Sequence, residues 1–130
     1  MSQFVPGVIK SFEAGEDLSS YQWHFVAATG TADSNKVSHA GANATTVGIL
    51  YNKPGAVGKE AQVIITGTAK LKINEAIGMG KQITSTGSAT GEVVDAAGEW
   101  IGAVALEYGA AQNDIIEVNV TSGEAYASDV

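Results

Sequence analysis

An internal near-repeat of two strand–loop–strand units is the feature that most constrains the fold. In the first unit, apolar segments 47–51 and 61–66 enclose a glycine-containing loop. Segments 101–106 and 115–120 enclose a similar loop in the second unit. Each unit begins with an apolar residue followed by a glycine, which predicts a β-bulge or a close approach of another backbone. Two such hairpins are expected to form opposed halves of a barrel or sandwich.

The spacing of turns and apolar runs favours strands throughout the chain. Sixteen glycines but only two prolines indicate many tight turns, and valine, isoleucine and threonine occur in short runs. A length of 130 residues fits one domain. The sequence therefore predicts an all-β fold, a small glycine-rich barrel or sandwich built of hairpins. At most one short helical turn is expected, over residues 75–77 after an Asn74 N-cap.

Other segments supply the remaining strands. In segment 21–29, Tyr21, Trp23 and Phe25 alternate with polar residues, which is typical of a half-buried strand. The other predicted strands are 36–40, at a sheet edge, 68–73, which continues strand 61–66 beyond Gly67, and 82–84 with 92–94, which form a hairpin.

We expect three parts: an N-terminal arm (1–17), a β domain (18–123) and a flexible C-terminal tail (124–130). The arm carries apolar residues with irregular spacing, and Pro6-Gly7 interrupts them. Such an arm either packs on its own domain or inserts into a partner, and the sequence leaves both alternatives open.

The charge and composition disfavour several classes of protein. A formal net charge of −7 repels nucleic-acid phosphates and anionic membrane surfaces. The absence of cysteine excludes disulfides, thiolate zinc sites and a thiol nucleophile. The start of the chain lacks the pattern of a signal peptide, and no apolar run is long enough to span a membrane, so we expect synthesis in the cytosol.

Motifs for catalysis or metal binding are weak. The candidates are His24 and His39 with Asp17 or Asp33, a Ser88-centred loop (86–91), two glycine loops with lysines (55–60 and 78–82), and the carboxylates Glu92, Asp95 and Glu99. None has the residue spacing of an established site, and turns and solvated charges explain them more simply. The sequence therefore predicts a protein that is not an enzyme, with no catalytic, cofactor-binding or metal-binding residues.

The order of several blocks resembles the small capsid cement, or head-decoration, proteins of tailed bacteriophages. The resemblance covers about 18–123, and the blocks that carry it are 47–54, the Gly58 loop, 66–71, 78–84, 101–107 and 114–120. It implies a β-rich body, commonly a homotrimer, on the outer surface of the mature head. The implied partner is the phage major capsid protein, bound where neighbouring subunits meet, without nucleic acid, membrane or cofactor.

The same resemblance implies a role for the arm. Members of this family often reach the shell through an N-terminal segment, so the interface candidates are Phe4, Val5, Pro6 and Phe12. Two alternatives remain open. One is a phage tail or baseplate component, and the other is a small carbohydrate-binding module that stacks sugars on Trp23, Tyr51 or Trp100.

Overall fold

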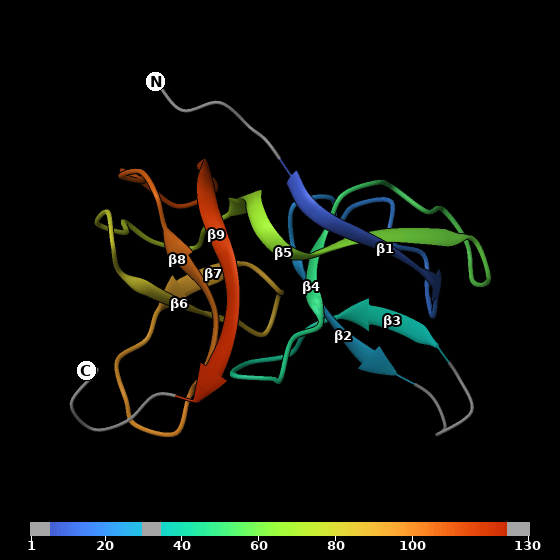
Figure 1. Cartoon of the computed structure of the whole chain (residues 1–130), viewed down its shortest axis with the longest axis horizontal. Coiled ribbons are helices and arrows are strands. Elements are labelled where there is room, and N and C mark those ends of the chain that lie inside the picture. Colours follow the sequence, from blue (N-terminus) through green and yellow to red (C-terminus); the bar gives the residue numbers. More distant parts are fainter. Residues whose placement is uncertain (1–5, 30–34, 125–130) are drawn as a thin grey trace.

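The computed structural model describes residues 6–29 and 35–124 (Figure 1). Within these residues every regular element is a strand, which confirms the all-β prediction, and residues 75–77 form no helical turn. No helix in this part of the chain is long and apolar enough to cross a membrane. The strands are β1 (Pro6–Ala14), β2 (Phe25–Thr29), β3 (Lys36–His39), β4 (Gly48–Leu50), β5 (Glu60–Lys72), β6 (Gln82–Ser85), β7 (Gly91–Val93), β8 (Trp100–Ala105) and β9 (Ile115–Glu124).

The strands form two rings that share β5. One ring has the order β1-β3-β2-β4-β5, and it closes because β1 also pairs with β5. The other has the order β5-β9-β8-β6-β7, and a bridge between Ile73 and Gly91 links the end of β5 to the start of β7. Figure 1 shows the rings side by side. We call residues 6–66 the first lobe and residues 67–124 the second lobe.

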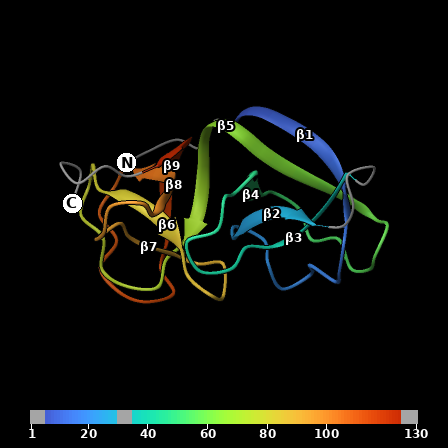
Figure 2. The same ribbon diagram turned by 90° about the horizontal axis from the view of Figure 1, so that it is seen from below.

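The shared strand β5 bends where it passes from one lobe to the other (Figure 2). Gly67 lies at this position with a φ of 93°, in the region that favours glycine. Its α-carbon also lies against the backbone of Gly7 in β1, so close that neither residue has room for a β-carbon. Both features require glycine, and they let one continuous strand, as predicted from segments 61–66 and 68–73, serve two rings.

The two predicted hairpins exist as the antiparallel pairs β4–β5 and β8–β9. They belong to different rings, so the expectation that they form opposed halves of one barrel is wrong. In each unit, neighbouring atoms lie so close to the glycine that a side chain would not fit, as the sequence predicted. A β-carbon on Gly48 would overlap the carbonyl of Ile64, and one on Gly102 would lie 2.7 Å from the ring of Phe25. Gly102 also lies at a register shift between β8 and β9.

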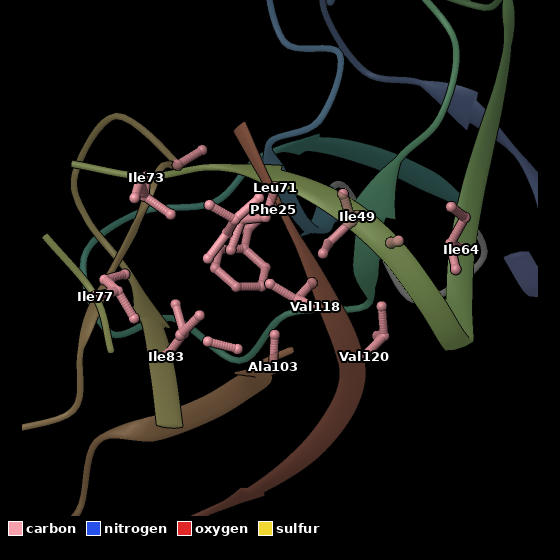
Figure 3. Close-up of a cluster of buried hydrophobic side chains, with 14 of the residues drawn as sticks. Phe25, Ile49, Ile64, Leu71, Ile73, Ile77, Ile83, Ala103, Val118 and Val120 are labelled. Carbon is pink, nitrogen blue, oxygen red and sulfur yellow. The ribbon is translucent and has the colours of Figure 1, made fainter. Parts of the chain in front are cut away.

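One hydrophobic cluster joins the two lobes. It surrounds Phe25 of β2 with side chains from the first lobe, such as Ile49, and from the second, such as Leu71, Ile83 and Val118 (Figure 3). A separate cluster fills the first lobe and consists of Ala14, Leu18, Val26, Val37, Leu50, Ala61 and Val63. The lobes are therefore packed on each other as well as connected through β5.

Two details of the strand predictions are wrong. Strand β2 begins at Phe25 rather than Tyr21, because Trp23 has a φ of 67° and cannot continue an extended strand. Strand β3 is not at a sheet edge, since it pairs with β2 on one side and with β1 on the other. The predicted hairpin of segments 82–84 and 92–94 is confirmed as β6–β7.

Candidate functional site

The predicted interface residues of the N-terminal segment fall into three groups. Phe4 and Val5 lie outside the described residues. Pro6 begins β1 and is paired with Gly67, at the junction between the lobes. Phe12 is half-buried and packs against the first-lobe cluster. Whether these residues contact a partner stays a prediction, but Phe12 already has a structural role within its own lobe.

Two further apolar residues of β1 face solvent. Val8 is 49% exposed and Ile9 is 39% exposed. Consecutive residues of a regular strand point to opposite faces, but the pairing of β1 with β5 shifts register between Val8 and Ile9. The irregularity allows both side chains to reach solvent. In the sequence, Val8, Ile9 and Phe12 belong to the same irregular apolar run. Only the register of β1 against β5 shows that Val8 and Ile9 are exposed and that Phe12 is half-buried.

The β1 strand pairs along most of its length with β5, from Pro6 to Glu13. Its last two residues also pair with β3, and Ala14 is buried in the first-lobe cluster. The N-terminal segment was expected either to pack on its own domain or to insert into a partner. Its described part, β1, packs on its own domain. The division of the chain into arm, domain and tail itself stays a prediction.

The two histidines contact Tyr21 rather than each other. The Tyr21 ring stacks on His39, with centroids 4.7 Å apart, and meets His24 edge-on at 5.2 Å. Nδ1 of His24 donates a hydrogen bond to the carbonyl of Gln22, and burial lowers the pKa of His24. The Glu16 carboxylate accepts hydrogen bonds from the backbone N–H and Nδ1 of His39, at 2.8 and 2.5 Å.

Metal binding by the histidines gains no support from these contacts. The carboxylate near His39 is Glu16, whereas Asp17 accepts the backbone N–H of Ser19, and Asp33 lies outside the described residues. Across residues 6–29 and 35–124, no group of three or more His, Asp or Glu side chains is arranged to hold a metal ion. The Glu16–His39 contact instead links the end of β3 to the segment after β1.

The predicted acidic loop is closed by its own carboxylates. Glu99 accepts hydrogen bonds from the backbone N–H groups of Asp95 and Ala96, at 2.8 and 3.2 Å. The pKa of Glu92 is raised, first by burial and then by the negative charges of Glu75, Glu99 and Asp95. These groups repel one another, so negative charge is concentrated on this side of the second lobe.

The loops that resemble catalytic or phosphate-binding motifs are turns between strands. Gly58 and Gly80 adopt φ values of 87° and 84° within them. In the loop around Ser88, the hydroxyls of Thr86 and Thr90 are 2.7 Å apart, and Ser88 N–H donates to the Thr86 hydroxyl. The polar groups of that loop are used to close the turn between β6 and β7.

The three aromatic residues of the carbohydrate-binding alternative do not form one surface. Trp23 and Tyr51 meet edge-on, with centroids 5.6 Å apart, and both pack against the main cluster. The Trp23 carbonyl accepts a hydrogen bond from the Lys72 N–H, and Lys72 is paired with Ile115, the first residue of β9. Trp100 is instead paired with Glu124, the last residue of β9. The ten residues of β9 separate these positions by roughly 30 Å.

Charge is unevenly divided between the two halves of the sequence. Residues 1–66 contain four lysines and five acidic residues, whereas residues 67–130 contain three lysines and nine acidic residues. The formal net charges are therefore −1 and −6. The half that contains the second lobe accounts for most of the acidity of the protein.

The fold has a counterpart among solved structures. Neither a protein-family model nor a curated protein matches the chain. Five chains of solved structures match. One is the crystal structure of the head fiber gp8.5 N base in bacteriophage phi29, with a TM-score of 0.70 over 88% of this chain and 95% of that chain, at 16% identity. The chain thus shares its fold with a structural protein of a bacteriophage head, as the resemblance of its sequence blocks predicted.

Proposed function

We propose that this protein is a non-enzymatic capsid decoration, or cement, protein of a bacteriophage. It binds the outer surface of the head where major capsid subunits meet and stabilises the shell. It is made in the host cytoplasm and becomes part of the virion as a homotrimer. The observation that carries this proposal is the shared fold with a phage head fiber base, which extends over nearly the whole of both chains.

The first lobe faces the shell in this proposal. Its half of the sequence has a net charge of −1 rather than −6, and removing a nearly neutral surface from water costs less than removing an acidic one. Strand β1 also presents Val8 and Ile9 to solvent, and in the sequence it follows directly after the apolar residues Phe4 and Val5. The contact therefore includes Phe4, Val5 and Pro6 together with Val8 and Ile9, whereas the half-buried Phe12 packs against the first-lobe cluster and lies at the margin of the contact.

Co-sedimentation with expanded phage heads that lack the protein tests this function. We expect saturable binding at a fixed ratio to the major capsid protein. Deleting residues 1–5 leaves β1 intact, since this strand begins at Pro6. That deletion, or Val8→Asp, should weaken binding about tenfold, because burying one apolar side chain contributes roughly 1.5 kcal/mol.

Val57→Asp is the matched control. Val57 is 61% exposed, lies in the first lobe outside β1, and should tolerate the charge without loss of binding. If neither the deletion of residues 1–5 nor Val8→Asp weakens head binding, the cement role stands but the proposed contact through the N-terminal region is refuted. A wild-type protein that binds no form of the head would contradict the cement role itself.

A further inference from the structure

The turn of residues 21–24, called here the junction turn, connects the two lobes through its backbone. Within the first lobe, the Trp23 N–H donates to the Leu50 carbonyl at 2.9 Å. The Trp23 carbonyl accepts the N–H of Lys72, at the end of β5 in the second lobe, at 2.8 Å. The junction turn is thus hydrogen-bonded to both lobes, and it lies immediately before Phe25, which belongs to the cluster that the lobes share.

Trp23 has a strained backbone conformation in this turn. Its φ of 67° lies in the left-handed region, which residues other than glycine rarely adopt. The His24 N–H donates to the Tyr21 carbonyl at 3.1 Å and closes the turn around Trp23, whose ring also lies edge-on against Tyr51. Strained conformations persist only while the surrounding contacts hold them. Loss of one of these contacts therefore favours release of the whole turn.

The side chain of His24 is buried in the junction turn as a neutral ring. It is 7% exposed. Its Nδ1 lies 2.9 Å from the Gln22 carbonyl, and because a carbonyl can only accept a hydrogen bond, Nδ1 carries the proton. A second proton can therefore be added only at Nε2. This would place a full positive charge on a ring that has left water, which is energetically unfavourable.

The titratable side chains beside His24 do not compensate for such a charge. The Tyr21 ring meets the His24 ring edge-on and stacks on His39, at the end of β3. The Glu16 carboxylate is bonded to His39, and this is the only ion pair between a histidine and a carboxylate in the described part of the chain. The carboxylate that follows β1 is therefore used by the other histidine.

The charges that act on His24 are positive. Burial is the main reason why the pKa of His24 is lowered, and the positive charges of Lys72 and His39 act in the same direction. Backbone hydrogen bonds of Gln22 and Tyr21 oppose these effects but do not cancel them. In an open turn, the ring would regain its ordinary pKa of about 6.5. Opening of the turn is therefore coupled to the uptake of a proton below this pH.

We propose that His24 makes the junction turn a pH-sensitive connection between the lobes. When the buried ring takes up a second proton, residues 21–24 separate from the end of β5, while the strands of both lobes stay folded. The rest of the junction is the apolar cluster around Phe25, whose buried members have no titratable group. The inference concerns a contact within one chain, so it goes beyond the proposed function and does not depend on head binding.

Hydrogen exchange of the Lys72 N–H tests the inference, because this group is bonded to the Trp23 carbonyl. Its protection factor, which corrects for the pH dependence of intrinsic exchange, should fall several-fold between pH 7.5 and pH 5.5. The fall should be at most about tenfold, because opening takes up one proton. The Leu106 N–H is the internal control. It is bonded to the Glu117 carbonyl within the second lobe, and its protection factor should be the same at both pH values.

His24→Gln is the test variant, because its amide can donate to the same carbonyl and is neutral at any pH. In this variant, the protection factor of the Lys72 N–H should no longer depend on pH. His39→Gln is the matched control, since it removes the histidine that stacks on the same tyrosine and should keep the wild-type dependence. Nuclear magnetic resonance of the wild type provides a measurement without substitution. The His24 ring signals should titrate with a midpoint below pH 6.5.

Three results would overturn the inference. A protection factor of the Lys72 N–H that is equal at the two pH values would show that the junction turn does not open on protonation. Equal losses of protection at Lys72 and Leu106 would show global unfolding instead of local opening. A pH dependence that survives in His24→Gln, or that disappears in His39→Gln, would assign the effect to a group other than His24.

Discussion

At the scale of single residues, the carboxylate of Glu92 destabilises the fold at neutral pH. Folding raises its pKa, so its protonated form is favoured by the folded state. Its contribution to stability is therefore present below the unfolded value of about 4.5 and is lost as pH rises through the folded pKa. Glu92→Gln should raise the free energy of unfolding at pH 7 by roughly 0.5 kcal/mol, the scale of interactions between partly exposed charges. Urea unfolding should show this gain at pH 7 and none near pH 4, while Glu13→Gln, on the exposed side of β1, changes little. Equal gains for the two variants would refute the acidic-cluster explanation.

At the scale of elements, the bend of β5 depends on the crossing of two glycines. Gly67→Ala would place a β-carbon against Gly7 in a left-handed backbone conformation. Gly58 has nearly the same φ but open space around it, so Gly58→Ala isolates the backbone cost of about 1–2 kcal/mol. Gly67→Ala should cost about 1–3 kcal/mol more, because the overlap forces β1 and β5 apart. Urea unfolding of both variants measures the difference. If the two variants lose the same free energy of unfolding, β1 can move away from β5 at Gly7 without an energetic cost.

At the scale of the whole molecule, the lobes should unfold together. They share β5, and the main cluster contains side chains from both. Trp23→Phe leaves Trp100 as a probe of the second lobe, and Trp100→Phe leaves Trp23 as a probe of the first. For each variant, the urea transitions from tryptophan fluorescence and far-ultraviolet circular dichroism should coincide, as in a two-state protein. Fluorescence that changes before the dichroism in either variant would show that this lobe unfolds independently.

Local sequence pattern determined the strands and the need for glycine at particular positions. The alternation in segments 61–66 and 68–73 predicted β5, and the apolar–glycine pairs predicted tight contacts at Gly48 and Gly102. These features depend on side-chain period and backbone sterics, which act over a few residues. The same local patterns predict turns at the glycine-rich motifs and solvated charges at the acidic one. Trp23 is the exception, because its left-handed φ interrupts an aromatic alternation that looks regular in the sequence.

The tertiary structure alone decided how the strands are grouped and which apolar residues remain exposed. Local patterns do not say that β5 serves two rings, because its partners β1 and β9 are far away in the sequence. The exposure of Val8 and Ile9 rather than Phe12 depends on a register shift against β5. The hydrogen bond between Trp23 and Lys72 likewise joins residues that are distant in the sequence. The sequence by itself therefore determined the strand content and the absence of an established catalytic motif, whereas long-range pairing decided the two-lobed architecture, the proposed shell contact and the proposed pH-sensitive connection between the lobes.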